Sequence, residues 1–147
     1  MSKLKNLIAG LAGSIALNLL HEGLKKTSND VPRVDLLGED ALQKTLKYFG
    51  GKMENQENLY KATLAGDIIG NTLYYSLIGA GNQKNIWPKA LFMGLSAGIG
   101  AVSLPEPMGL DPDPVTKDNQ VKVLTVGYYL FGAVVTGLVL HAMKKNN

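Results

Sequence analysis

The feature that most constrains the fold is an apolar run at residues 123–143 that contains no acidic residue, lysine or arginine. A helix of this length can cross the ~30 Å hydrocarbon core of a bilayer. Further apolar windows lie at residues 6–25, 59–81 and 86–104. The mean hydropathy of +0.04 hides this segregation, because most charged residues lie between the windows. We therefore expect an all-α integral membrane protein, with a single domain over residues 1–147 and four transmembrane helices in an antiparallel bundle.

A soluble four-helix bundle is the alternative fold, and each of its helices would need a polar face toward water. Residues 123–143 have no such face, and residues 90–104 carry little polarity beyond two serines, so the sequence favours membrane insertion. Lys3 and Lys5 before the first apolar run also resemble the start of a signal peptide, but we expect this segment to be retained as the first span. The chain contains no cysteine, which excludes disulfides and thiolate chemistry.

Two long extramembrane loops are expected, at residues 26–58 and 105–122. In the first, a short amphipathic helix is predicted at residues 41–49, beginning after Gly38. It either packs on the bundle or rests on the membrane surface. Its predicted apolar face consists of Leu42, Leu46 and Phe49. The second loop is rich in proline and acidic residues and should be ordered, but it lacks the glycine-containing spacing of an EF-hand, so we expect no metal there.

A polar stripe runs through the apolar window at residues 59–81. On a period of 3.6 residues, Thr63, Asp67 and Asn71 fall on one helical face. An ionisable side chain within lipid is costly. Asp67 should therefore face other helices or a water-filled cavity, and it should have a polar partner.

The first apolar window carries a matching stripe that includes Asn18 and His21. Because consecutive spans run antiparallel, Asn18 and Asp67 should both lie ~10 Å from the same membrane face. Asn18, with His21 above it, is thus the expected partner of Asp67. The sequence predicts a candidate polar pocket formed by Asn18, His21, Glu22, Thr63, Asp67 and Asn71. The alternative is that these side chains only join helices through hydrogen bonds.

Small residues recur at spacings that suit close contact between helices. Gly10 and Gly13 in the first window should let a neighbouring backbone approach. Gly94 and Gly98 form a Gly-x-x-x-Gly pair in the third window, which predicts tight internal packing more than self-association. His141 lies near the opposite membrane face from His21, which excludes a two-histidine metal site in the pocket.

Lysines predict the orientation of the chain in the membrane. With four spans, both termini and the turn at residues 82–88 share one side. That side carries bases and no acid; the bases are Lys3, Lys5, Lys84, Lys89, Lys144 and Lys145. The other side has more lysine and arginine in total, but they are spread over longer loops among many acids. We expect a multi-pass protein of the inner (plasma) membrane with both termini in the cytoplasm.

Three features of the sequence occur together. A Pro-Arg pair lies in the first loop, at residues 31–35; the third span is rich in small residues; and a proline-flanked Met-Gly-Leu-Asp-Pro element, residues 108–112, precedes the last span. In these respects the chain resembles the YagU-like family of small bacterial inner-membrane proteins. The resemblance covers the C-terminal third and a few loop residues, and the rest of the first loop differs from the family pattern. It implies a small inner-membrane protein and no particular activity.

Several functions are compatible with the sequence. The first is a structural or accessory subunit that packs with itself or with a larger membrane complex. The alternative is a proton- or ion-coupled channel or carrier that uses Asp67 and His21, since histidine titrates near neutral pH. A third is a lipid-modifying enzyme with His21 and Glu22 as acid–base groups. No nucleophile has a convincing spacing, however, so we expect no enzymatic activity and assign no catalytic residue.

The expected partners follow from the same composition. Membrane lipids and a homo-oligomer or membrane-complex partner are expected. The net charge of +3 comes from scattered lysines with a single arginine, which is a poor match for a nucleic-acid interface. The glycines recur at helix-packing spacings and form no phosphate-binding loop, so no cofactor is expected.

Overall fold

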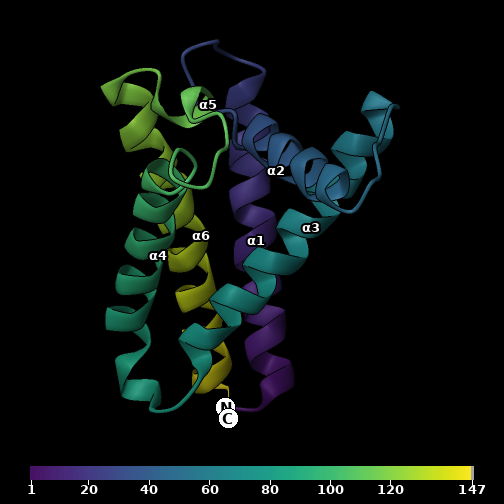
Figure 1. Cartoon of the computed structure of the whole chain (residues 1–147). Helices are drawn as coiled ribbons and strands as arrows, with labels where there is room; N and C mark the ends of the chain where they lie inside the picture. Colours follow the sequence, from purple (N-terminus) through teal and green to yellow (C-terminus); the bar gives the residue numbers. More distant parts are fainter. Residues whose placement is uncertain (147) are drawn as a thin grey trace.

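The structure is a computed structural model, and it describes residues 1–146 as helices joined by turns and loops, with no strand in that range. Four long helices form a bundle, and a shorter helix, α2, lies across one end of it (Figure 1). The elements in chain order are α1 (Lys3–Lys25), α2 (Val34–Tyr48), α3 (Gln56–Ser76), the 3-10 turns η1 (Leu77–Gly79) and η2 (Gln83–Asn85), α4 (Ile86–Ser103), the short α5 (Asp113–Thr116) and α6 (Asn119–Lys145).

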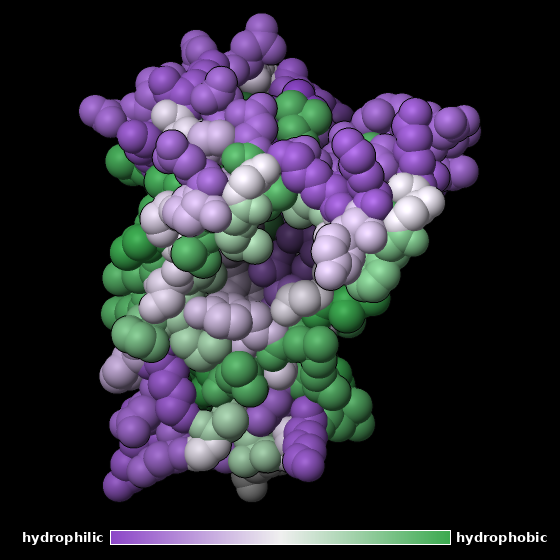
Figure 2. Space-filling view, viewed as in Figure 1, coloured by the Kyte–Doolittle hydropathy of each residue, from purple (hydrophilic) through white to green (hydrophobic). Residues whose placement is uncertain are grey.

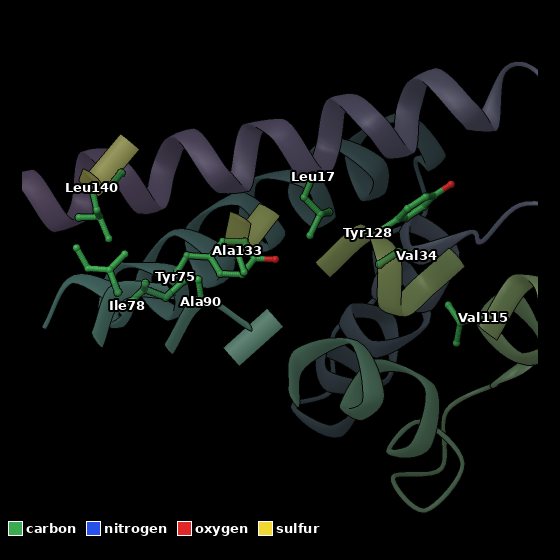
Figure 3. Close-up of a cluster of buried hydrophobic side chains, with 11 residues drawn as sticks. Leu17, Val34, Tyr75, Ile78, Ala90, Val115, Tyr128, Ala133 and Leu140 are labelled. Carbon is green, nitrogen blue, oxygen red and sulfur yellow. The ribbon is translucent and has the colours of Figure 1, made fainter. Parts of the chain in front are cut away.

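Helix α6 is the centre of the bundle: it packs between α4 and α1, and α1 in turn packs against α3 (Figure 1). Helix α3 is tilted, so its C-terminal end meets the bundle while its N-terminal end leans away beneath α2 (Figure 1). The buried side chains form one core that follows α6 and includes Leu17, Tyr75, Ile78, Tyr128 and Leu140 (Figure 3).

Glycines permit the closest helix contacts, as the sequence predicts. A Cβ atom on Gly13 would collide with the carbonyl of Gly132 on α6, and one on Gly10 would collide with the carbonyl of Thr72 on α3. Gly98 lies against the backbone of Val126 on α6, and Gly94 lies against the next turn of that helix. The Gly-x-x-x-Gly pair of α4 therefore serves contact within the chain, since its glycine face is already covered.

The outer surface of the bundle carries a broad apolar belt between two hydrophilic ends (Figure 2). Within residues 1–146, three helical segments are long and apolar enough to cross a membrane: Lys3–Lys25, Gln83–Ser103 and Asn119–Lys145. Their outward-facing side chains include Leu4, Ile8, Leu11, Ile15 and Leu19 on α1, Phe92, Leu95 and Ile99 on α4, and Val123, Phe131 and Leu138 on α6. This is the surface expected of a membrane protein.

Helix α3 does not reach the same apolarity, although it crosses the bundle from end to end (Figure 1). Its sequence includes Glu57, Lys61, Asp67 and Asn71, which lower its mean hydropathy. Three helices are thus apolar enough to be membrane spans, whereas the sequence predicts four. The helix also ends earlier than predicted, because the chain tightens into η1 at Leu77.

The sequence prediction for α2 is wrong at its N-terminal end, whereas the predicted end at Phe49 is the C-cap of the observed helix. The helix begins at Val34 instead of Ala41, and Gly38 lies inside it. A glycine is needed there because a Cβ atom would come within 2.7 Å of Thr63 Cγ2 on α3. Phe49 lies beyond the helix and is exposed together with Tyr48, whereas Leu42 packs inward. Of the two predicted positions for this helix, on the bundle or on the membrane surface, the structure shows the first: α2 packs on the bundle.

The two long loops contact each other and form a joint polar cap, and residues 119–122 of the second predicted loop belong to α6. Arg33 donates its backbone N–H to the carbonyl of Pro114 at 2.9 Å. Lys117 Nζ lies 2.9 Å from Asp30 Oδ1, and Lys44 Nζ donates to the carbonyl of Gly109 at 2.6 Å. These contacts fix α2 against the loop that leads into α6.

Candidate functional site

Asp67 lies at the middle of α3 and points into the space beneath α2. Asn71, one turn further along the same helix, donates a hydrogen bond from Nδ2 to Asp67 Oδ1 at 3.0 Å. Asn18 of α1 lies beside the same carboxylate, and its Nδ2 also donates to the carbonyl of Ser14 at 2.9 Å. The predicted pairing of Asn18 with Asp67 is present in the structure, and it arises from the antiparallel contact of α1 and α3.

His21 lies one turn above Asn18 and is almost completely buried. The nearest carboxylate to it is that of Asp35, at the start of α2, with 3.3 Å between Nε2 and Oδ1. Glu22 Oε1 lies 3.6 Å from His21 Nδ1. The ring of His21 also meets the edge of Tyr128, with 6.0 Å between centroids. His21 thus connects the bundle core to the charged end of the molecule.

Asp35 is the centre of an ion-pair network that joins α1 and α2. Its side chain is 8% exposed, and it accepts two hydrogen bonds from Arg33, at 2.9 Å from Nε and 2.8 Å from Nη2. Lys25 Nζ lies 3.4 Å from Asp35 and 2.8 Å from Glu22. Tyr60 of α3 completes the network by donating its hydroxyl to Glu22 Oε1 at 2.6 Å.

The electrostatics of Asp35 follow from these contacts. Burial alone raises the pKa of its carboxyl group, but the adjacent His21 and Arg33 outweigh burial and hold the pKa well below its usual range. The hydrogen bond to Asp35 likewise raises the pKa of Arg33 above its ordinary value. Asp35 therefore remains ionised through the physiological range and keeps α2 fixed to the end of α1.

A cavity of about 230 Å³ lies between α1, α2 and α3. Its polar lining includes five predicted pocket residues, Asn18, His21, Glu22, Thr63 and Asp67, while Asn71 stands behind Asp67 and bonds to it. A second cavity of about 440 Å³ lies between α2, α3 and α4. Asp67 lines both cavities. Figure 2 shows a hydrophilic hollow in this face of the molecule, set within the apolar belt.

The structure brings the six predicted residues together and adds others that the sequence reasoning missed. Asp35, Arg33, Lys25 and Tyr60 belong to the same site. A signal for Asp35 was available, since an acid in the first turn of a helix is favoured by the helix dipole, but the predicted start of α2 left it in a loop. His141 lies near the C-terminal end of α6, away from the site, as predicted. There its ring lies near that of Trp87.

The site has no arrangement suited to a metal ion. Over residues 1–146, no three His, Cys, Asp or Glu side chains are placed to hold one. The reason is visible at Asp35 and Glu22, whose oxygens are occupied by Arg33, Lys25 and Tyr60. These side chains can form hydrogen bonds and ion pairs and can exchange protons.

Comparison with known proteins identifies no family model, no curated protein and no solved structure that matches this chain. The resemblance to the YagU-like proteins therefore stays a prediction.

Proposed function

We propose that the chain is a structural or accessory protein of the inner membrane, which associates with a second copy of itself through α3. The observation that carries this proposal is an uncovered glycine pair on that helix. Gly66 and Gly70 are exposed, and a Cβ atom on either would meet nothing within 4 Å. They are spaced as Gly-x-x-x-Gly, the pattern that suits close helix contact in membranes.

The other glycines at this spacing already have neighbours. Gly94 and Gly98 of α4 both contact α6. Against this background, the open pair on α3 supports a partner from outside the chain. Ile69 and Leu73 flank the pair and are also exposed, so the face offers apolar contact on both sides of the glycines.

The low apolarity of α3 supports the same conclusion. Asp67 and Asn71 are only partly buried by the chain itself, and lipid is a poor environment for either side chain. A second protein surface beside α3 would shield this flank from lipid. A second copy suits the geometry, because a two-fold axis along the membrane normal would bring the two glycine faces together as parallel helices.

The proposal also includes α3 as a fourth membrane span and a cytoplasmic position for both termini. With α3 covered by a partner, all four long helices cross the membrane. The first and last turns of the chain lie at the same end of the bundle (Figure 1). This end carries the acid-free set of lysines, which supports a cytoplasmic position for both termini.

The mass of the particle in mild detergent tests the proposal, with Gly70→Leu compared against Gly127→Leu. Both glycines are helical and exposed, and both have open space at Cβ, so neither leucine should disturb the fold. We expect a dimer for the unmodified chain and for Gly127→Leu, and a monomer for Gly70→Leu. A monomeric unmodified chain, or a dimer that survives Gly70→Leu, would refute self-association through α3.

A second function is favoured by a separate observation. Titratable side chains lead from the middle of the bundle to its polar end, from Asp67 through His21 to Asp35 and Glu22. This arrangement suits a proton- or ion-coupled channel or carrier. Such a protein reconstituted in vesicles should dissipate an imposed ion or proton gradient, and Asp67→Asn should abolish the flux while the particle keeps its helicity. Flux that persists in Asp67→Asn would exclude this mechanism.

A further inference from the structure

The cavity between α1, α2 and α3 has an unbalanced charge. Among its lining residues in the described chain are three carboxylates, Glu22, Asp35 and Asp67, and no lysine or arginine. Lys25 and Arg33 lie outside the lining and pair with Glu22 and Asp35. No lysine or arginine within residues 1–146 forms an ion pair with Asp67, whose neighbours are the amides of Asn18 and Asn71 and the imidazole of His21.

We propose that this cavity binds a small organic cation, a protonated amine attached to an apolar group, with Asp67 as its counter-ion. A buried carboxylate is stabilised by a cation that reaches it, and a substituted ammonium group supplies both the charge and several N–H donors. This inference rests on other observations than the association through α3, although Gly66 belongs both to the glycine pair and to the lining of the cavity.

A second polar group in the cavity supports the assignment. Thr63 is 9% exposed and lies one helical turn before Asp67 on α3. In the described part of the chain its hydroxyl has no hydrogen-bond partner, and it lines the same cavity. A buried polar atom without a partner is uncommon in proteins. An ammonium group placed between Thr63 and Asp67 could donate to both.

The remaining lining selects an organic cation over an inorganic one. Leu17, Leu42 and Leu64 form apolar walls of the cavity. A hydrated inorganic ion gains nothing from such walls, whereas a hydrocarbon group is stabilised by leaving water. The volume of about 230 Å³ lies below the ~300–1,000 Å³ of sites for drug-sized ligands, which points to a ligand of single-ring size.

Access to the cavity fits a molecule that partitions into the membrane. The second cavity, of about 440 Å³, shares Val34, Gly38 and Asp67 with the first, so the two meet beneath α2. The hollow seen in Figure 2 has a mixed rim, in which near-neutral residues alternate with hydrophobic ones. An amphiphilic amine could therefore reach Asp67 through the second cavity, between α2, α3 and α4.

Binding of matched fluorinated probes to the full-length protein in a neutral detergent tests this inference. The probes are 4-fluorobenzylamine and 4-fluorobenzyl alcohol, which have the same shape and differ in charge. Their affinity is measured by ¹⁹F NMR titration at pH 7, with empty micelles as the blank. We expect the amine to bind at least tenfold more tightly than the alcohol, because charge-assisted hydrogen bonds are worth more than neutral ones. Equal affinity for the two probes would overturn the inference.

Two variants and a control locate the effect. Asp67→Asn keeps the shape of the side chain and should remove the preference for the amine, whereas Glu57→Gln makes the same charge change at an exposed position of α3 and should leave it intact. Thr63→Val retains the contact with Gly38 and should weaken amine binding severalfold, which provides a test if Asp67→Asn does not fold. A preference that survives Asp67→Asn, that is lost in Glu57→Gln, or that is unaffected by Thr63→Val would place the binding elsewhere.

The result of the amine-binding test can be distinguished from the result of the association test. Gly70→Leu should remove the dimer and leave the preference for the amine, because Gly70 is not part of the lining of either cavity.

Discussion

Replacement of Asp35 by asparagine should be among the most destabilising single changes at the polar end of the molecule. The carboxylate is 8% exposed and is contacted by Arg33 at 2.8 Å, His21 at 3.3 Å and Lys25 at 3.4 Å. Removing one member of a buried ion pair costs about 3–5 kcal/mol, because its partners remain desolvated. Arg33 is 39% exposed and is partly screened by water, which reduces the expected loss to about 2–4 kcal/mol.

The assay is thermal unfolding in mild detergent, followed by circular dichroism. Asp30→Asn is the matched control: the side chain of Asp30 is 72% exposed and pairs with Lys117 at the surface, so its loss should cost under about 1 kcal/mol. Arg33→Gln should cost less after Asp35→Asn than before it, since both changes remove the same pair.

The pH dependence supplies a second readout. The pKa of Asp35 is depressed in the folded chain, so its contribution is fully present above the unfolded value of about 3.9 and is lost as the pH falls toward the folded value. The difference in the free energy of unfolding between the unmodified chain and Asp35→Asn should therefore be largest near pH 7. It should shrink as the pH falls below about 4. Equal losses for Asp35→Asn and Asp30→Asn, or a gap that does not narrow in acid, would refute this account.

Two further predictions concern the bundle. Gly13→Val should lower the melting temperature by several degrees and Gly23→Val should have little effect, because a Cβ on Gly13 collides with the backbone of Gly132 whereas one on Gly23 meets nothing; equal melting temperatures would contradict the packing. Tyr75→Phe should cost about 1 kcal/mol, because the Tyr75 hydroxyl donates to the carbonyl of Tyr129 at 2.8 Å. Tyr128→Phe should be close to neutral, because the buried Tyr128 hydroxyl has no hydrogen-bond partner in the described chain, and chemical unfolding of the two variants tests the contrast.

The parts of the fold that could be predicted are those governed by short-range periodicity. An apolar window must form a helix within lipid, and the predicted windows at residues 86–104 and 123–143 fall on α4 and α6 to within a few residues. The meeting of Asn18 with Asp67 was also predictable, because antiparallel helices place residues of equal depth side by side. Neither inference needs any knowledge of how the loops fold.

The remainder depends on contacts between distant segments. Gly38 resembles a helix boundary in the sequence, but in the structure it makes room inside α2 for Thr63 of α3. Asp35 consequently moves from an expected loop into the first turn of a helix, where it meets His21 and Lys25 of α1. Such a position is set by how α2 crosses the bundle, which hydrophobic periodicity does not encode.

The central position of α6 has a consequence for biosynthesis. This helix leaves the ribosome after α1, α3 and α4, yet it lies between α4 and α1 and supplies the backbone against which Gly13 and Gly98 pack. Until it is inserted, α1 can pair with α3 while α4 lacks its main neighbour. A nascent chain that stops before residue 119 would thus leave an unmatched hydrophobic helix in the membrane, a state that quality-control proteases could recognise. Insertion of α6 therefore completes the packing of the other long helices.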